Sequence, residues 1–478
     1  MTATPEFVRK DIFRIVSEVA AKRGVKAFAI GGYVRDCFLG RPCNDIDIVV
    51  EGSGIEFATE VGAVTGSRVS YFKNFGTAML RYRGDEIEFV GARRESYRRE
   101  SRKPIVEDGT LADDQQRRDF TINAMAFSLN EGSFGELVDP FGGIKDLAEG
   151  IIRTPIEPDT TYSDDPLRML RAIRFASKLS TPQLSFTIVP ESIESMRRMA
   201  PRLGILSKER IAEELNKMLE TPRPSIAFRL LDEAGLLHFI LPQLEALKGV
   251  ETVDGRGHKD NFAHTLAVMD NVAAADGPTP KLWLRWAALL HDIGKAVVKK
   301  YVPGTGWTFH GHDLVGSRMV PGIFNSLKLP LDEMKYVRKL VWLHMRPIAL
   351  VDEEVTDSAV RRLLFDAGDD IDDLMLLCHA DITSRNLEKV RRIHANFELV
   401  KQKLVEVEAK DAIRNFKNPI TGDYVMQVYG IEPCNTIGII KEYVKEAILE
   451  GEIGNNFEEA DVLMRRKAAE LGLTPVCK

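Results

Sequence analysis

The pattern of hydrophobic positions changes near residue 150, and the two parts of the chain predict different kinds of structure. Before this point, short apolar runs end at glycine-containing turns, which is typical of strands, and helical stretches lie between them. After Pro166, apolar residues recur at helical spacing and prolines separate short helices. This order predicts an α+β fold, with a mixed head followed by an all-α region. The predicted strands are residues 27–30, 47–50, 78–82 and 86–90, and the predicted N-terminal helices are residues 12–21 and 55–61.

Chain length divides this pattern further. The 478 residues correspond to roughly three domains of ordinary size. Pattern and length together predict four parts along the chain. They are a head over 1–150, a helical neck and body over 151–250, a helical domain with histidine-containing turns over 251–400 and a helical tail over 401–478.

Composition excludes several classes of protein. No apolar run approaches the length of about 18 residues that a membrane-spanning helix needs, and Arg9, Lys10 and Asp11 fall where a secretion signal would be apolar. The five cysteines are scattered without a pairing pattern, so we expect a reducing cytoplasm. The formal net charge of −6 disfavours a nucleic-acid partner for the chain as a whole, although local basic stretches oppose this average.

A glycine pair and two aspartates form the first chemical motif. The strand that ends at Gly31-Gly32 lets backbone N–H groups approach a ligand, and the helix that follows carries Arg35 in its first turns, where phosphate is favoured. Asp45 and Asp47 lie two apart on a strand and therefore face the same side. Paired carboxylates repel unless cations lie between them, and two Mg²⁺ ions held in this way support nucleotidyl transfer.

Two nearby features leave alternatives open. Glu88 lies on the predicted strand 86–90, where it is either a third carboxylate of the site or a solvent-facing residue. Residues 93–103 contain six basic and two acidic side chains and the aromatic Tyr97. They are either solvated surface or a mobile loop that contacts acceptor RNA or assists nucleotide switching.

The string Arg117-Arg118-Asp119-Phe120-Thr121-Ile122-Asn123-Ala124 is the second motif. Together with the first, it resembles the class II tRNA nucleotidyltransferases, the family of CCA-adding enzymes and bacterial poly(A) polymerases. The resemblance implies a polymerase-beta-like nucleotidyltransferase head followed by helical neck and body. It also implies that Asp139–Gly143 is a turn that closes the head. The implied roles are triphosphate binding by Gly32 and Arg35, metal binding by Asp45 and Asp47, and nucleotide contact by Arg118.

Residues 164–175 provide the third motif. Pro166 fits the first position of a helix, which makes Asp165 a natural N-cap, and Arg168, Arg171, Arg174 and Lys178 then share one side of that helix. In the resembled family this motif selects the nucleotide, which implies that Asp165 and Arg168 bond the base edge and that Arg171 contacts the nucleotide. Asp164 departs from the glutamate that is usual there, so a role for its carboxylate is in doubt. A later stretch, Ser207–Arg210 with Glu213, resembles a structural motif of the family.

Histidine turns form the fourth motif. His264, the pair His291-Asp292 and Asp381 come from separate helical stretches, which is a usual way to hold a divalent metal. Their order resembles the HD phosphohydrolase domain, which implies Ni²⁺, Mn²⁺ or Mg²⁺ at these residues. His310 and His344 are alternative further ligands. Some members of the family carry this domain as an active phosphatase or phosphodiesterase and others for shape or RNA contact, and both alternatives stay open.

These motifs favour one function among several. The first hypothesis is a Mg²⁺-dependent tRNA nucleotidyltransferase that adds CCA to the 3′ end of tRNA from CTP and ATP without a template. The second is an enzyme that adds only CC, only A or a poly(A) tail, and the third is a metal-dependent phosphohydrolase whose head only docks RNA. A non-enzymatic RNA-binding module would leave the carboxylates without a purpose.

Overall fold

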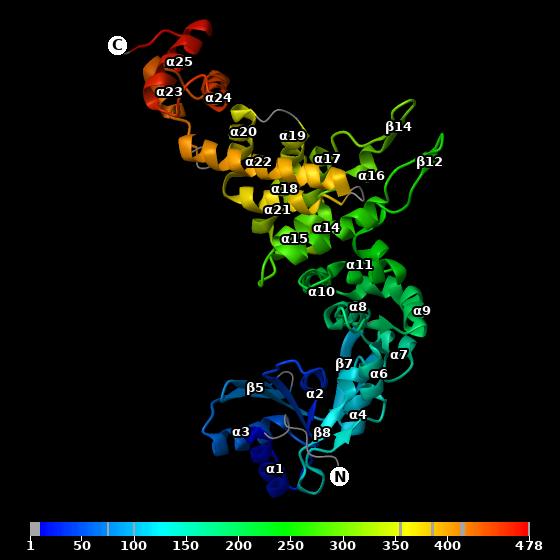
Figure 1. Ribbon diagram of the computed structural model, residues 1–478. Helices are drawn as coiled ribbons and strands as arrows, with labels where there is room; N and C mark the ends of the chain where they lie inside the picture. The colour runs from blue at the N-terminus through cyan, green and yellow to red at the C-terminus, as the bar shows by residue number, and fades with distance from the viewer. Residues whose placement is uncertain are drawn as a thin grey trace. The chain divides into compact units, whose positions relative to one another are not determined.

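The computed structural model describes residues 10–73, 76–98, 101–352, 356–383, 387–411 and 416–476. The chain divides into two compact units, Met1–Pro242 and Gln243–Lys478, and each unit is described by itself (Figure 1). Within the described residues, every helix is too short or too polar to span a bilayer.

A seven-stranded sheet forms the base of the first unit (Figure 1). Neighbouring strands pair antiparallel, except that β2 and β5 are parallel. The predicted hairpin is confirmed as β4 and β5, with Arg83 and Gly84 in the turn at positive φ. The order across the sheet is β3 (Val69–Phe72), β4 (Thr77–Tyr82), β5 (Asp85–Gly91), β2 (Asp45–Val50), β1 (Ala27–Ile30), β8 (Ala126–Ser128) and β9 (Leu137–Val138).

Helix α3 (Gly54–Thr65) packs against β4 and β5 on one face of this sheet, and α1 (Asp11–Arg23) packs against α3. Phe57 of α3 meets Phe89 of β5 with ring centroids 5.8 Å apart, and full burial of a phenylalanine stabilises a fold by about 1.5–3 kcal/mol. Successive side chains of a strand point to opposite faces. The residues that alternate with the buried Ile46, Ile87 and Phe89 therefore lie on the other face, away from α3.

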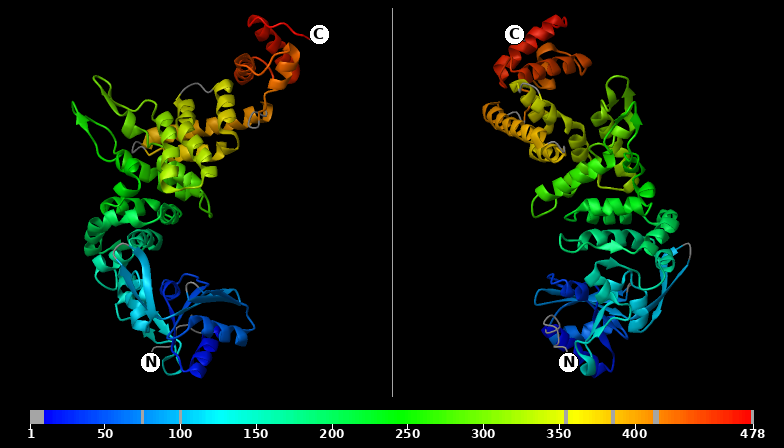
Figure 2. Two further views of the ribbon diagram at one scale, coloured as in Figure 1. Left: turned by 180° about the vertical axis from the view of Figure 1, so that it is seen from behind. Right: turned by 45° about the vertical axis from the view of Figure 1, so that its right-hand side comes forward.

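The basic stretch after β5 is a hairpin of its own, and the predicted mobile loop over 93–103 is wrong in that respect. β6 (Arg93–Arg98) pairs antiparallel with β7 (Ser101–Asp108), and residues 99–100 lie outside the described part of the chain. Figure 2 shows the hairpin as a separate ribbon beside the sheet. Main-chain pairing satisfies the backbone here, so a charged sequence without apolar periodicity still forms strands.

Short helices follow and complete the first unit. Helix α8 lies at the centre of the helical part, where it packs against α7, α10 and α11, as expected from the helical spacing after Pro166. The elements are α4 (Leu111–Gln116), α5 (Thr121–Ala124), α6 (Gly143–Glu149), α7 (Pro158–Asp164), α8 (Leu167–Leu179), α9 (Pro190–Met199), α10 (Lys208–Leu219), α11 (Pro224–Glu233), α12 (Leu237–Ile240), the 3-10 turns Glu131–Ser133 and Ala200–Ile205, and the paired strands β10 (Ile151–Ile152) and β11 (Thr187–Ile188).

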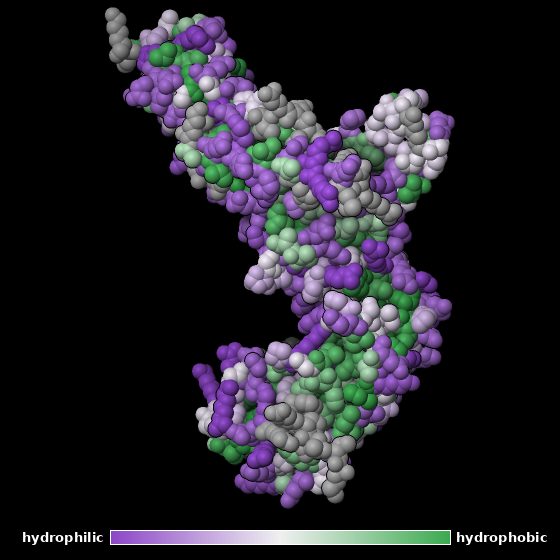
Figure 3. All heavy atoms as spheres, in the orientation of Figure 1, coloured by the Kyte–Doolittle hydropathy of each residue, from purple (hydrophilic) through white to green (hydrophobic). Residues whose placement is uncertain are grey.

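The second unit is almost entirely helical, and two short hairpins, which the apolar pattern did not predict, interrupt it. Figure 3 shows hydrophilic residues over most of its visible face. Its elements are α13 (Pro242–Glu245), β12 (Thr252–Val253), β13 (Arg256–Gly257), α14 (Asn261–Ala275), α15 (Leu282–Leu290), α16 (Lys295–Val298), β14 (Lys300–Val302), β15 (Gly306–Thr308), α17 (His312–Leu327), α18 (Leu331–Leu343), α19 (Met345–Asp352), α20 (Asp357–Ala367), a 3-10 turn at Gly368–Asp370, α21 (Ile371–Ala380), α22 (Leu387–Asp411), α23 (Gly422–Tyr429), α24 (Asn435–Glu450) and α25 (Phe457–Glu470).

The predicted boundary at residue 400 falls inside α22, which packs against α19 and α20 (Figure 1). Helices α23–α25 come after this helix, and α24 contacts α20. The Arg362 guanidinium of α20 bonds Glu446 and Glu450 of α24, with Arg362 Nε 3.1 Å from Glu450 Oε1. Helix α22 is thus continuous across residue 400.

Candidate active site and metal centre

Three carboxylates lie together on the face of the sheet that points away from α3. Asp47 of β2 is the register partner of Glu88 of β5, and Asp45 is on the same face two residues before Asp47. Burial raises the pKa of Asp47, Arg118 opposes this rise, and the charges of Asp45 and Glu88 add to it, so that the pKa comes to about 6. A divalent cation would relieve this repulsion. The site therefore fits Mg²⁺, and Glu88 lies beside the two aspartates.

The Gly31 turn lies directly against this carboxylate group. Gly31 has φ of 82°, and a Cβ atom there would come within 2.7 Å of Arg118 Nη1 and 3.3 Å of Asp47 Oδ2. Asp114 Oδ2 accepts a hydrogen bond from Arg118 Nε at 3.1 Å and so fixes the guanidinium over the turn. Only glycine fits between the Arg118 guanidinium and the Asp47 carboxylate. A triphosphate at this turn would meet Arg118 on one side and the metal-binding carboxylates on the other.

Arg35 lies in α2 (Gly32–Phe38), whose first residue is Gly32, and its side chain is more enclosed than its predicted role requires. It is 5% exposed, donates to both carboxylate oxygens of Asp36, and donates to Asn123 Oδ1 at 2.7 Å. Its guanidinium also lies 5.1 Å from the centre of the Phe175 ring in α8. Arg35 thereby connects α2, α5 and α8 and brings positive charge beneath the glycine turn.

Two arginines of α8 bond to Arg117-Arg118-Asp119, called here the Arg-Arg-Asp block. Asp119 Oδ2 accepts two hydrogen bonds from Arg171, and Arg168 Nη2 donates to the Arg117 carbonyl at 2.7 Å. Arg174, which was grouped with them, is instead buried against Glu214 with Nε 2.6 Å from Oε2. Arg174 Cζ also lies 4.5 Å from the Phe175 ring centre, so its guanidinium contacts groups inside the first unit.

The start of α8 differs by one residue from the prediction. Asp164 ends α7, and α8 begins at Leu167, with Pro166 as its N-cap residue. The Asp165 side chain still accepts a hydrogen bond from the Leu167 N–H at 3.1 Å, as a cap would. Asp139, in the predicted closing turn, accepts from the N–H groups of residues 143 and 144 and so begins α6.

A pocket of about 500 Å³ opens over the carboxylate face. The residues that line it come from the strands β2–β6 and from the Arg-Arg-Asp block. They are Asp47, Phe72, Thr77, Met79, Glu88, Val90, Arg93, Arg117 and Arg118.

The second unit brings all four predicted HD residues together. His264 Nε2 is 2.8 Å from Asp381 Oδ1, and His291 Nε2 is 3.3 Å from Asp292 Oδ2. Two further histidines complete the cluster, His344, which was an alternative ligand, and His312, which was not proposed as one, and they lie 3.7 and 3.3 Å from Asp292 Oδ1. The six residues form two groups with metal-ligand spacing. They are His264, His291 and Asp381, and Asp292, His312 and His344.

His310 is exposed and lies outside this cluster, so of the two alternative ligands only His344 belongs to it. His312 could have been found, since it opens the helix after a glycine, as His291 precedes a glycine turn. His344 could be named only as an alternative ligand, because it directly follows α18 in an apolar context without a glycine turn beside it.

Each imidazole ring in the cluster is oriented by a contact of its Nδ1 atom, which points away from the centre of the cluster. The Nδ1 atoms of His291, His312 and His344 donate to the carbonyls three residues earlier, at 2.7–2.9 Å. A carbonyl only accepts, so a neutral ring held in this way directs the lone pair of Nε2 toward the centre. Nε2 of His312 and of His344 lie 3.2 Å apart, and the buried Nε2 of His291 makes no hydrogen bond of acceptable geometry to the described residues. Imidazole nitrogens that converge with carboxylates fit a divalent metal.

Electrostatics support this interpretation. Burial lowers the pKa of His291, but the carboxylates of Asp292 and Asp381 outweigh burial and raise it. Burial lowers the pKa of His344. The cluster thus favours positive charge at its centre, and without a metal a proton on His291 supplies it. Lys295 Nζ, 2.6 Å from Asp292 Oδ2, adds a cation at the rim.

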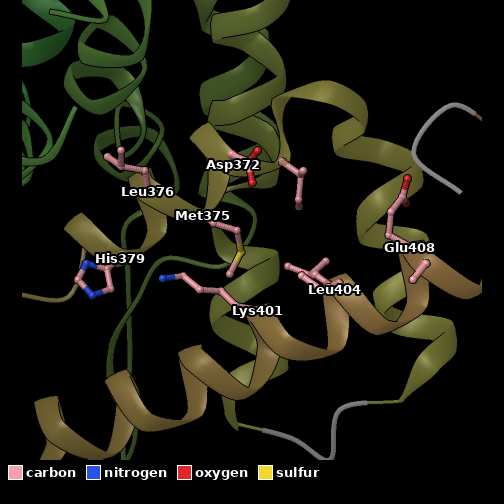
Figure 4. Close-up of a pocket in the computed structure, with 10 residues that line it drawn as sticks. Asp372, Met375, Leu376, His379, Lys401, Leu404 and Glu408 are labelled. Carbon is pink, nitrogen blue, oxygen red and sulfur yellow. The ribbon is translucent and has the colours of Figure 1, made fainter. Parts of the chain in front are cut away.

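A separate cavity of about 700 Å³ lies between α21 and α22 (Figure 4). Its floor is apolar, with Met375, Leu376 and Leu404 among the lining side chains, and His379 and Lys401 stand at one end (Figure 4). The cluster residues are not among the residues that line it.

Fold and site define a nucleotidyltransferase head joined to helical domains, the last of them with an HD-type cluster. The family models agree. Residues 27–153 match the poly(A) polymerase head domain, 185–248 match the probable RNA- and SrmB-binding site of polymerase A, and 261–386 match the HD domain.

Relatives place the chain within this class. It is 32% identical over 366 residues to an A-adding tRNA nucleotidyltransferase of Deinococcus radiodurans, and this match covers 75% of this chain and 80% of the relative. It is 34% identical over 373 residues to a multifunctional CCA protein of Xanthomonas campestris pv. campestris, and this match covers 76% of this chain and 86% of the relative. The chain belongs to the tRNA nucleotidyltransferase family, as the resemblance predicted.

A solved structure shows the same fold. The Thermotoga maritima CCA-adding enzyme complexed with tRNA superposes with a TM-score of 0.60 at 21% identity, over 98% of both chains. The expected α+β architecture, a polymerase-type head followed by helical domains, is therefore confirmed.

Proposed function

We propose that this protein adds the CCA sequence to the 3′ end of tRNA from CTP and ATP, without a template, in the cytoplasm. The observation that carries the proposal is the position of Asp45, Asp47 and Glu88 on one sheet face, directly against the Gly31 turn and Arg118. Relatives named as multifunctional CCA and A-adding enzymes support the same reaction class. The tRNA 3′-hydroxyl attacks the α-phosphorus of the nucleotide, a new phosphodiester forms, and pyrophosphate leaves.

Mg²⁺ would be held by Asp45 and Asp47, and when bound it activates the hydroxyl and neutralises the charge on the leaving group. The N–H groups that begin α2 at Gly32 and the guanidinium groups of Arg118 and Arg35 attract the triphosphate. These groups orient the nucleotide so that its α-phosphorus lies over the carboxylates.

Base selection is assigned to α8. The Asp165 side chain is held at the helix start, and Arg168 is fixed by the Arg117 carbonyl. A carboxylate beside a guanidinium offers an acceptor and a donor to the edge of C or A, with Arg171 as a further nucleotide contact. Since Arg168 and Arg171 are tied to the Arg-Arg-Asp block, a shift of α8 would move phosphate and base contacts together.

One assay separates complete from partial addition. Purified protein is incubated with Mg²⁺, CTP and ATP, singly and together, and with tRNA ending before CCA, after C, or after CC. Complete addition predicts that CTP extends the first two substrates and ATP only the third. An enzyme that extends only tRNA ending in CC is A-adding, one that stops after CC is CC-adding, and untemplated A-tails indicate a poly(A) enzyme.

The second unit supports a second candidate function, a metal-dependent phosphohydrolase on RNA or nucleotide phosphates. Its specific observation is the two neighbouring groups of metal-ligand spacing, between which Asp292 Oδ2 lies 3.3 Å from His291 Nε2. The ion would be Ni²⁺, Mn²⁺ or Mg²⁺, and when bound it supplies a Lewis acid and a water nucleophile. The test is conversion of a 2′,3′-cyclic nucleotide to the nucleoside monophosphate, and release of phosphate from that monophosphate, with each metal, compared with Asp292→Asn. An inactive wild-type protein would leave the cluster as a structural or RNA-contacting element.

A further inference from the structure

The face of the sheet that bears the carboxylates continues as an uncharged, partly apolar surface on the far side of Glu88. Strand register defines two rows across β3, β4, β5 and β2. One row holds Ser70, Met79, Glu88 and Asp47, and the adjacent row holds Phe72, Thr77, Val90 and Val49. Moving from Asp47 toward the sheet edge, the side chains therefore change from acidic to uncharged after Glu88, where the apolar Met79 and Phe72 lie beside the hydroxyl groups of Ser70 and Thr77.

Phe72 is the outermost member of this surface. It is 44% exposed, although it lines the same pocket as Asp47 and Glu88. Met79 lies one strand nearer to the carboxylates, opposite Glu88, and lines the pocket too. A solvent-exposed aromatic ring at the mouth of a phosphate-handling pocket has the chemistry of a stacking platform for a nucleobase.

Two nucleotides meet in this reaction, and geometry distinguishes their positions. The glycine turn and Arg118, which suit the triphosphate, lie at the β1 side of Asp47. Phe72 lies at the opposite side, three strand spacings or about 14 Å from β2. In an in-line displacement, the attacking oxygen and the leaving pyrophosphate are on opposite sides of the phosphorus. The attacking hydroxyl therefore approaches from the side of β5, β4 and β3.

We propose that Phe72, with Met79 beside it, stacks on the 3′-terminal base of the acceptor tRNA and so positions the attacking hydroxyl over Glu88 and Asp47. This inference rests on the proposed function. Arg93 and Arg117 line the same pocket, where they suit the backbone phosphates of the acceptor strand. Every base has a π face, so a stacking contact accepts whichever base ends the acceptor at each round of addition. Selection then falls on the incoming nucleotide alone.

The experiment combines a protein change with a substrate change. The protein variants are Phe72→Ala, Phe72→Trp and a matched control, Tyr71→Ala. Tyr71 is 47% exposed on the same strand but points to the other face, where its hydroxyl is 3.3 Å from Thr59 Oγ1. The substrates are tRNA ending in CC and the same tRNA with an abasic 3′-terminal nucleotide.

We expect Phe72→Ala to lower kcat/KM for tRNA about tenfold, within the range for loss of one stacked base, without a change in KM for ATP. Phe72→Trp and Tyr71→Ala should stay near the wild-type value. The abasic end should reduce the wild-type rate by a similar factor and have no further effect on Phe72→Ala. Equal melting temperatures of the variants exclude a folding defect.

Three results would overturn the inference. The first is an unchanged kcat/KM for tRNA in Phe72→Ala. The second is a rate of Phe72→Ala with the abasic tRNA that is reduced by the product of the two separate factors. The third is a raised KM for ATP as the main effect of Phe72→Ala. A wild-type protein that adds no nucleotide to any acceptor overturns the proposed function itself, whereas an active wild-type protein with an unaffected Phe72→Ala variant overturns only the stacking role.

Discussion

Arg171 donates two hydrogen bonds to one oxygen of Asp119, from Nε at 2.8 Å and from Nη2 at 2.6 Å. Asp119 also accepts from Asn123 Nδ2 at 3.0 Å through its other oxygen. This carboxylate therefore joins helix α8, which carries the nucleotide-selecting residues, to the block that carries Arg118.

Asp119→Asn should destabilise the first unit at neutral pH by roughly 2–3 kcal/mol, because the change leaves Arg171 beside a neutral amide. Burial would raise the pKa of Asp119, but Arg171 and Asn123 outweigh burial and lower it to about 2. An ordinary aspartate has a pKa near 4, so the pair stabilises the fold above about pH 4 and loses its effect as the pH falls toward 2.

Urea unfolding of wild type and variant at several pH values measures this difference. The gap between their unfolding free energies should be constant from pH 7 to about 4.5 and narrow below that. A gap that is absent at pH 7 would show that the pair does not hold the two elements together.

Asp47→Asn should abolish nucleotide addition while tRNA binding is retained, because the amide cannot hold Mg²⁺ as the carboxylate does. The same variant should be more stable than wild type without Mg²⁺ at pH 7.5. Since the pKa of Asp47 is raised to about 6, its ionised form destabilises the fold above that pH. We expect a gain of about 1 kcal/mol, or roughly 2–4 °C in melting temperature.

Glu86→Gln is the control for this variant. Glu86 lies on the same face opposite Asp45 but its side chain pairs with Arg81. Glu86→Gln should leave the rate of nucleotide addition within about twofold of wild type. Full turnover by Asp47→Asn would refute the metal assignment.

Gly31→Ala should reduce nucleotide addition by roughly a hundredfold, because the added methyl group displaces Arg118 from the carboxylate site. Gly40→Ala is the control for a positive φ alone: φ is +64° at Gly40 and +82° at Gly31, but no atom lies within 4 Å of a Cβ added at Gly40. Gly40→Ala should lower the unfolding free energy by about 1–2 kcal/mol through backbone strain. Gly31→Ala should lower it by more, because the ψ of −134° at Gly31 lies outside the left-handed helical region. Steady-state kinetics should separate them, and equal activity of the two variants would contradict the crowding argument.

His291→Ala should lower the affinity of the second unit for Mn²⁺ or Ni²⁺ at least tenfold, because Nε2 of this residue faces both Asp292 and Asp381. Metal content after dialysis, measured by mass spectrometry, and the rise in melting temperature on adding metal are the two readouts. His310→Ala, outside the cluster, should match wild type in both. A chelator that leaves the wild-type melting temperature of this unit unchanged after metal loading would argue against the site.

The first unit was predictable where periodicity carries information. Asp45 and Asp47 share a face because strand side chains alternate, and the β4–β5 hairpin follows from two apolar runs around Gly84-Asp85. The hairpin of β6 and β7 was not predictable, because its charged residues show no apolar alternation and main-chain pairing alone defines it.

The sites were predictable as residue types and less so as contacts. Arg35 was expected to face a phosphate, but its bonds to Asp36 and Asn123 depend on how α2, α5 and α8 pack. His344 was an alternative ligand beside His310, and the choice between them depends on the packing of α18 against α15 and α17, which sequence spacing does not encode. Asp119 and Glu214, which anchor α8, were missed for the same reason.

The carbonyl contacts of His291, His312 and His344 are made within a single turn of each residue's own backbone. Three of the four imidazoles are thus aimed by local geometry, before any ion arrives. Metal binding therefore costs little free energy for ordering the ligands. The metal-free and metal-bound forms of the second unit should share one structure, and the ion can exchange without unfolding this unit.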